Sequence, residues 1–156
     1  MNITIVAVGK LKERFWTDAC AEYLKRLGGY ARVTVREVPD IGSRQAKSPA
    51  EAIQKEGVAI MDALPERAHV VLLDIGGRER SSTQIATRIE QLGLQGESEL
   101  AFVIGGSDGV SQEVRDRADE SLSFGPITLP HNLARVVLLE QLYRAFKIIR
   151  HEPYHK

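Results

Sequence analysis

Residues 123–149 of the chain read Ser-Phe-Gly-Pro-Ile-Thr-Leu-Pro-His-Asn-Leu-Ala-Arg-Val-Val-Leu-Leu-Glu-Gln-Leu-Tyr-Arg-Ala-Phe-Lys-Ile-Ile. Glycine and proline mark the first part as a loop, and the pattern predicts a helix from about Asn132. Apolar side chains cover most of the circumference of this helix: Leu133, Val136, Val137, Leu138, Leu139, Leu142, Tyr143, Phe146, Ile148 and Ile149. A helix that is apolar nearly all round is buried on more than one side. One side can face a sheet, and we expect a second copy of the chain, in a homodimer, to cover the other.

The composition is that of an ordinary soluble globular protein. The chain has 156 residues, of which 43% are hydrophobic and 27% charged, so we expect one domain over residues 1–156 with a sizeable core. No apolar run reaches the length of a membrane span and no signal-peptide pattern is present, which favours a cytoplasmic protein. Cys20 is the only cysteine, so no internal disulfide and no structural zinc site are expected.

Charge is balanced overall but unevenly distributed. The formal net charge is zero, so nothing in the total attracts nucleic acid. Residues 1–36 carry seven Lys and Arg against three Asp and Glu, and residues 135–156 carry five against two. A basic patch results if the two ends meet in space or across a dimer, and ordinary solvated faces are the alternative.

Segments with strand and helix patterns alternate along the chain. Strands are predicted at residues 2–8, 33–38, 69–74, 100–104 and 121–124. Helices are predicted at residues 13–27, 48–64, 81–92 and 111–118, with Ser48 and Ser81 as N-caps and Cys20 buried. The run 69–74 is apolar enough for a strand buried on both faces, and Ile75-Gly-Gly77 is expected to end it. The alternation predicts an α/β fold with a mostly parallel sheet covered by helices on both faces.

Three loops follow strands of this predicted sheet, at residues 73–77, 105–109 and 124–130. Ligands of such sheets bind beyond the carboxyl ends of the strands. All three loops are rich in glycine or proline and lack a concentration of charge, so their backbone can approach a flat, nearly neutral ligand such as an adenosine moiety. The spacing in loop 105–109 is neither a dinucleotide fingerprint nor a Walker phosphate loop. Tight turns without a ligand are the alternative for each loop.

No nucleophile–base pair is evident in the sequence. His69 begins an apolar strand and His131 precedes the long helix, and both positions favour structural roles. Glu140 and Arg144 stand four residues apart and are expected to form a helix ion pair. The tail, residues 150–156, holds a phenol, two imidazoles and two cations, and is either a frayed end or a docked part of a site.

These motifs together resemble the SPOUT methyltransferases, and in particular the small members that modify ribosomal RNA. The resemblance covers essentially the whole chain. It includes the Gly-Gly-Ser-Asp-Gly loop, the Leu-Pro-His turn with its following helix, and the Pro-Tyr-His ending. The matching segments are residues 1–11, 102–109, 122–124, 128–131, 135–138, 140–147 and 153–155.

The resemblance implies an α/β fold whose C-terminal segment threads a loop to form a trefoil knot, and it implies a homodimer. The implied reaction is N3-methylation of the pseudouridine at position 1915 of 23S ribosomal RNA on the assembled ribosome, with no metal. The implied cofactor is S-adenosyl-L-methionine, bound in the knot. Its sites carry over onto Leu73, Gly105, Phe124, Gly125, Pro126, Ile127, Thr128 and Leu129.

The chemistry of such a reaction assigns roles to three further residues. The ring nitrogen of a uracil-like base must lose a proton before it attacks the methyl group, and a protein can take that proton or stabilise the anion. Arg135 is a fixed cation near the loop at 124–130, with a surface or interface ion pair as its alternative role. Tyr154 and His155 are candidates to orient the base or accept the proton.

Two other functions are compatible with the same sequence. One is a non-catalytic RNA-binding or ribosome-associated module on the same scaffold. The other is a nucleotide- or flavin-binding protein of the flavodoxin type, which would be yellow or release flavin on denaturation. Methyl transfer from labelled S-adenosylmethionine to ribosomes separates an enzyme from the RNA-binding module.

Overall fold

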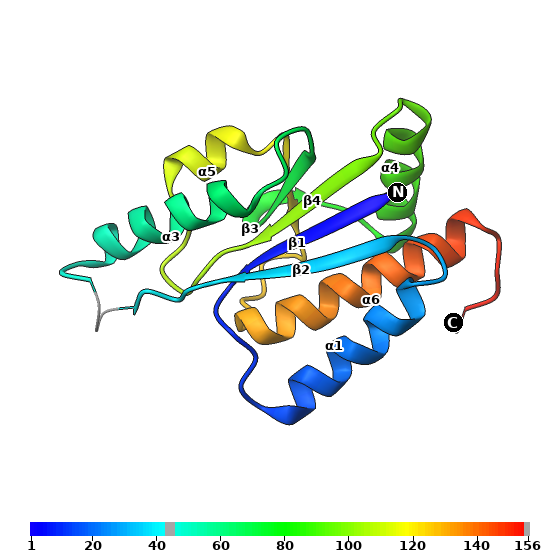
Figure 1. The fold of residues 1–156 in the computed structure, drawn as a ribbon. Coiled ribbons are helices and arrows are strands. Elements are labelled where there is room, and N and C mark those ends of the chain that lie inside the picture. Colours follow the sequence, from blue (N-terminus) through cyan, green and yellow to red (C-terminus); the bar gives the residue numbers. More distant parts are fainter. Residues whose placement is uncertain (43–45, 155–156) are drawn as a thin grey trace.

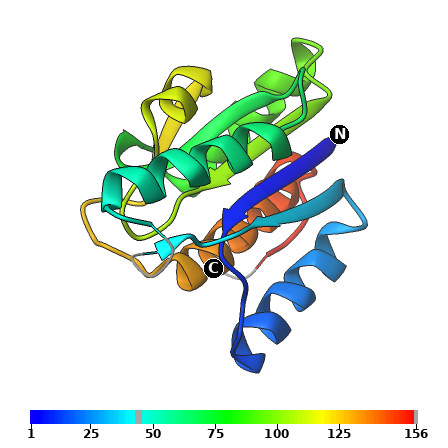
Figure 2. The ribbon, with the colours of Figure 1, turned by 60° about the vertical axis from the view of Figure 1, so that its left-hand side comes forward.

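The part of the chain that the structure describes forms a parallel sheet with helices on both faces (Figures 1 and 2). The computed structural model describes residues 1–42 and 46–154. The strands are β1 (Asn2–Val8), β2 (Arg32–Val38), β3 (His69–Glu79), β4 (Glu99–Ile104) and β5 (Glu120–Ser123). The helices are α1 (Arg14–Leu27), α3 (Pro49–Ala63), α4 (Ser82–Leu94), α5 (Gln112–Arg117) and α6 (His131–Ile149). The strand order is β2-β1-β4-β3-β5 and every pairing is parallel, which confirms the predicted fold class.

Serine side chains begin three of the helices. Ser48 accepts a hydrogen bond from the Glu51 amide at the start of α3, where proline occupies the first helical position. Ser81 and Gln84 form a complete capping box at the start of α4, as their spacing predicted. Ser111 caps α5 in the same way. Each cap satisfies a backbone amide that has no partner within its helix.

Strand β3 is longer than the sequence indicated. The prediction that residues 75–77 end it is wrong, because the strand continues to Glu79 with a register shift between Leu73 and Arg78. Glycine permits this bulge, since a Cβ on Gly77 would lie only 2.9 Å from Cβ of Ser121 on β5. Pairing then resumes, with Arg78 opposite Leu122. The bulge therefore carries Arg78 and the residues after it along the β5 edge of the sheet.

Side chains alternate between two apolar clusters, one on each face of the sheet. On β1, Ile3 and Ile5 point into the cluster formed with α1, α4 and α6. Val6 and Val8 point into the second cluster, beneath α3. Figure 1 shows α3 and α5 above the sheet and α1 and α6 below it. Cys20 is buried in the first cluster, where burial raises the pKa of its thiol, as expected for a core cysteine.

Helix α6 packs against β4 and lies between α1 and α4. Its residues Leu138, Leu139 and Leu142 are fully buried. From the sequence, we expected a second copy to cover the side of α6 that faces away from the sheet. Helices α1 and α4 cover much of that side, while Val136 and Tyr143 stay partly exposed. The homodimer and the trefoil knot stay predictions. Among the described residues, no helix combines the length and apolarity needed to cross a membrane.

We predict that Leu139→Ala lowers the free energy of unfolding by about 2–5 kcal/mol, because it empties a fully buried position of α6. Leu94→Ala is the matched control, since that leucine at the end of α4 is 84% exposed. The control should change stability by less than about 0.5 kcal/mol. Urea unfolding of both variants measures the difference, and equal small effects would contradict this account of the core.

Candidate active site

The bulged part of β3 and the loops that follow β4 and β5 surround one cavity of about 640 Å³. The sequence predicted three separate loops, at residues 73–77, 105–109 and 124–130. The first of these segments lies within β3 instead, and the structure brings all three segments together. Of the residues assigned to cofactor binding, the cavity is lined by Leu73, Gly105, Phe124, Gly125, Ile127, Thr128 and Leu129. Pro126 belongs to the same loop but is not among the lining residues.

Topology explains why the third loop reaches the other two. Strand β5 is an edge strand, whereas α6 lies between α1 and α4. Residues 124–130, which connect them, therefore pass over the carboxyl ends of β3 and β4. The buried Ser123 hydroxyl fixes the start of this passage, because it donates to the Ile75 carbonyl at 2.9 Å and accepts from the Gly125 amide at 3.0 Å. Gly125 has φ +99°, a conformation that favours glycine.

The loop after β4 is held in a tight conformation. Gly106 and Gly109 form an isolated antiparallel bridge. A Cβ on Gly105 would lie 2.5 Å from Cγ1 of Val110, and one on Gly106 would lie 2.9 Å from Oε1 of the buried Glu56. Burial raises the pKa of the Glu56 carboxyl although the Ile41 amide donates to it. The close packing leaves no room for larger side chains at the first two glycines.

The cavity wall is mainly apolar, with a small number of polar groups. Ile75 and Ile127 are exposed at its rim. Arg115 and Asp74 form an ion pair of 2.9 Å inside it, which the sequence analysis missed. The place of Asp74 at the end of the predicted strand 69–74 was a usable signal, whereas nothing in the sequence marked Arg115. Apolar walls with a few placed polar groups suit a flat organic ligand such as a purine nucleoside.

Arg135 lies behind the cavity rather than in its wall. It is 3% exposed, and it donates to Glu37 Oε2 at 2.8 Å and to the Gly9 carbonyl at 3.1 Å. Its Nε is buried without a hydrogen-bond partner. The alternative considered from the sequence was a surface or interface ion pair. Arg135 is instead buried in an ion pair with Glu37 of its own chain, which ties α6 to the ends of β1 and β2. A direct role for Arg135 at the reacting atoms stays a prediction.

His131, given only a packing role from the sequence, lines the cavity at the first turn of α6. Its Nε2 lies 3.6 Å from the position that a Cβ on Gly9 would occupy. The signal for it was its place directly after the loop at 124–130. Among the described residues, no group of three or more His, Cys, Asp or Glu could hold a metal ion.

Tyr154 packs on the far half of α6. Its hydroxyl donates to Glu140 Oε2 at 2.7 Å, and the Arg144 guanidinium lies 4.3 Å from its ring centroid. The predicted ion pair of Glu140 with Arg144 is confirmed at 2.8 Å. Glu140 is about 13 Å along the helix axis from His131, so Tyr154 does not line the cavity of its own chain. His155 lies outside the described residues.

The environment of Tyr154 also affects its proton chemistry. Burial, together with the hydrogen bond to the Glu140 carboxylate, raises the pKa of the Tyr154 phenol to about 12. The phenol is therefore neutral at physiological pH, where it can donate a hydrogen bond but is a poor acceptor of a substrate proton. Of the two roles considered from the sequence, this favours orientation of a base.

Comparison with known proteins gives a consistent result over the full length. A family model described as "Predicted SPOUT methyltransferase" matches residues 1–155. Similar curated proteins are called ribosomal RNA large subunit methyltransferase H. Those of Listeria welshimeri and Listeria monocytogenes are each 52% identical to this chain, and that of Bacillus thuringiensis is 51% identical. Each alignment covers 100% of both proteins.

We predict that Arg135→Ala lowers the free energy of unfolding by about 2 kcal/mol or more, because it removes the buried partner of Glu37. Arg14→Ala is the control, since Arg14 forms only an exposed pair with Asp18. The control should cost less than about 1 kcal/mol. Chemical unfolding measures both, and the double variant Arg135→Ala with Glu37→Ala should be little less stable than Arg135→Ala. An Arg135→Ala protein as stable as the parent would contradict a structural role for this pair.

Proposed function

Since this chain belongs to the SPOUT methyltransferase family, we propose that it uses S-adenosylmethionine to methylate ribosomal RNA of the large subunit. The observation that carries the proposal is that 51–52% of residues are identical, over the full length, to proteins named for that activity. The cavity formed by the three loops supports it independently, because it is shaped from backbone and apolar groups at the ligand-binding edge of a parallel sheet. We place the activity in the cytoplasm, where assembled ribosomes are found.

The residues around the cavity fit S-adenosylmethionine in their chemistry. Leu73, Phe124 and Leu129 offer apolar surface to an adenine ring, and the backbone of loop 105–109 offers donors and acceptors. Asp74 and Arg115 are the charged side chains near this surface. When bound, the cofactor supplies a methyl group that its sulfonium already activates.

The finer assignment is N3 of the pseudouridine at position 1915 of 23S ribosomal RNA. This ring nitrogen carries a proton at neutral pH, and that proton must leave before N3 attacks the methyl group. His131 is the histidine that lines the cavity, and we assign it the role of receiving this proton. Arg135 lies one turn further along α6 and holds the Gly9 carbonyl and Glu37 beneath it. It thereby fixes the position of the first turn of α6.

Tyr154 does not line the cavity of its own chain, so a direct part in the reaction would require a second copy. Tyr154 is held against Glu140 and Arg144, far along α6 from its own cavity. We propose a homodimer in which the partly exposed side of α6 forms the interface, so that Tyr154 and His155 of one copy serve the cavity of the other. Such an interface would also explain why apolar side chains of α6, such as Val136 and Tyr143, remain partly exposed between α1 and α4.

Methyl transfer to ribosomes tests the proposed function. The purified protein is incubated with S-adenosylmethionine labelled in the methyl group and with ribosomes that lack the modification. We predict incorporation of a single methyl group into large-subunit RNA, recovered as N3-methylpseudouridine after digestion. A protein that binds ribosomes but incorporates no label would instead be a non-catalytic RNA-binding module.

Mixing two inactive variants tests the shared site. Gly105→Val places side-chain atoms against Val110 and should prevent cofactor binding. Removal of residues 154–156 deletes the end of the tail, including Tyr154 and His155. We predict that each variant alone is inactive and that mixed dimers regain activity, because one intact cavity then meets one intact tail. Size-exclusion chromatography checks that both variants remain dimeric. No recovery in mixed dimers would show that the tail acts on the cavity of its own chain.

A further inference from the structure

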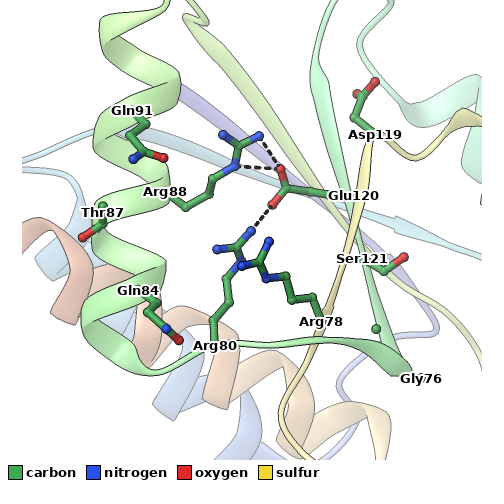
Figure 3. A pocket seen from close by; sticks show the side chains of 11 residues that line it. Gly76, Arg78, Arg80, Gln84, Thr87, Arg88, Gln91, Asp119, Glu120 and Ser121 are labelled. Atoms are coloured by element: carbon green, nitrogen blue, oxygen red, sulfur yellow. Dashed lines mark hydrogen bonds and ion pairs between the residues drawn. The ribbon is translucent and has the colours of Figure 1, made fainter.

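A second pocket, of about 830 Å³, lies along the β5 edge of the sheet (Figure 3). Three arginines line it. Arg78 and Arg80 come from the end of β3 and the residue after it, and Arg88 comes from α4. In Figure 3 their side chains reach from opposite sides toward Glu120 on β5. We call this site the arginine pocket.

Glu120 holds two of these guanidinium groups in place. Arg88 donates two hydrogen bonds to Glu120 Oε2, at 2.9 and 2.7 Å, and Arg80 lies 3.7 Å from Oε1. His69 is 2.9 Å from the same Oε2. Burial alone would raise the pKa of Glu120, but the hydrogen bonds from Arg88 and His69 outweigh it and the pKa is lowered. The ionised carboxylate therefore fixes both arginines before any ligand arrives.

Positive charge exceeds negative charge in the arginine pocket. Asp119 also faces it, but its Oδ2 already accepts from the Val70 amide at 2.8 Å and pairs with Arg117 at 3.4 Å. Arg78 is exposed, and none of the ion pairs within residues 1–42 and 46–154 involves it. An anion can therefore bind Arg78 without first breaking an internal pair. The planar fork of a guanidinium matches two oxygens of a phosphate.

A third depression lies between the arginine pocket and the candidate active site. This depression, of about 610 Å³, shares Arg80 and Gln84 with the arginine pocket. It shares Phe124 and Gly125 with the cofactor cavity. The three hollows thus lie next to one another, with the mainly apolar cavity at one end and the arginine pocket at the other. An RNA strand whose base enters the cavity would have its backbone near the arginine pocket.

We propose that the arginine pocket binds a backbone phosphate of the RNA strand that presents the target base. The inference rests on the proposed function and deepens it. Gln84 and Gln91 on α4 add neutral donors beside the arginines. A purely structural role, in which the cluster joins α4 to β5, accounts for Arg80, Arg88 and Glu120. It does not account for Arg78, which forms no ion pair in the cluster. Phosphate contacts of this kind position an RNA without reading its sequence.

Substitution of Arg78 tests the proposal without disturbing the internal cluster. Arg78→Gln removes the charge and Arg78→Glu reverses it, and Arg32→Gln on the opposite edge strand β2 is the matched control. We predict that Arg78→Glu weakens ribosome binding at least about tenfold, while S-adenosylmethionine affinity and thermal stability match the parent. In Arg78→Gln the slope of log affinity against log salt should fall by about one, because one phosphate contact is lost. Arg32→Gln should change neither quantity.

Normal ribosome affinity and an unchanged salt slope in both Arg78 variants would overturn the proposal. Saturable binding of inorganic phosphate to the parent protein would also overturn it, if Arg78→Glu abolished that binding but left ribosome affinity unchanged. The arginine pocket would then be a site for free phosphate. Binding and methyl transfer are measured separately. A parent protein that binds ribosomes but transfers no methyl group overturns the proposed function alone, and the binding measurements still decide on the arginine pocket.

Discussion

The burial of α6 between α1 and α4 is the constraint on which the candidate site depends. Leu138, Leu139 and Leu142 must leave water, and the space for them lies beneath the middle of the sheet. The preceding strand, β5, lies at the edge. The chain can satisfy both only by passing residues 124–130 over the ends of β3 and β4. This passage closes the cavity. The packing of α6 beneath the sheet therefore also determines where the cavity lies.

The molecule separates its charges according to the two ligands it is proposed to hold. The cavity is mainly apolar, and its cation Arg115 is already paired with Asp74. Arg135, the arginine nearest to it on α6, is buried against Glu37 and holds the scaffold. In the neighbouring arginine pocket, by contrast, Arg78 forms no ion pair with the described residues. A nearly neutral nucleoside site beside a cationic pocket suits a reaction between S-adenosylmethionine and a polyanion.

Much of the fold, and the place of the cavity at the carboxyl edge of the sheet, could be predicted from local sequence patterns. Caps such as Ser81 with Gln84, and the glycine loops after apolar strands, act over a few residues and are therefore visible in the sequence. The misses depend on distant partners. The continuation of β3 through Gly77 depends on its pairing with β5, which places Ser121 close to Gly77. The ion pair of Arg135 with Glu37 joins residues 98 positions apart in the sequence. The contact of Tyr154 with α6 depends on how the tail folds back, which no periodicity encodes.

The location of the cofactor tests the central claim most directly. The measurement is a crystal structure of the protein with S-adenosylhomocysteine, the product that S-adenosylmethionine leaves after methyl transfer. Our account predicts the adenine ring in the cavity, between Leu73 of β3, Gly105 of the loop after β4 and residues 124–130. An adenine ring bound in the arginine pocket, or on a surface outside the three loops, would contradict the claim that the passage of residues 124–130 builds the cofactor site.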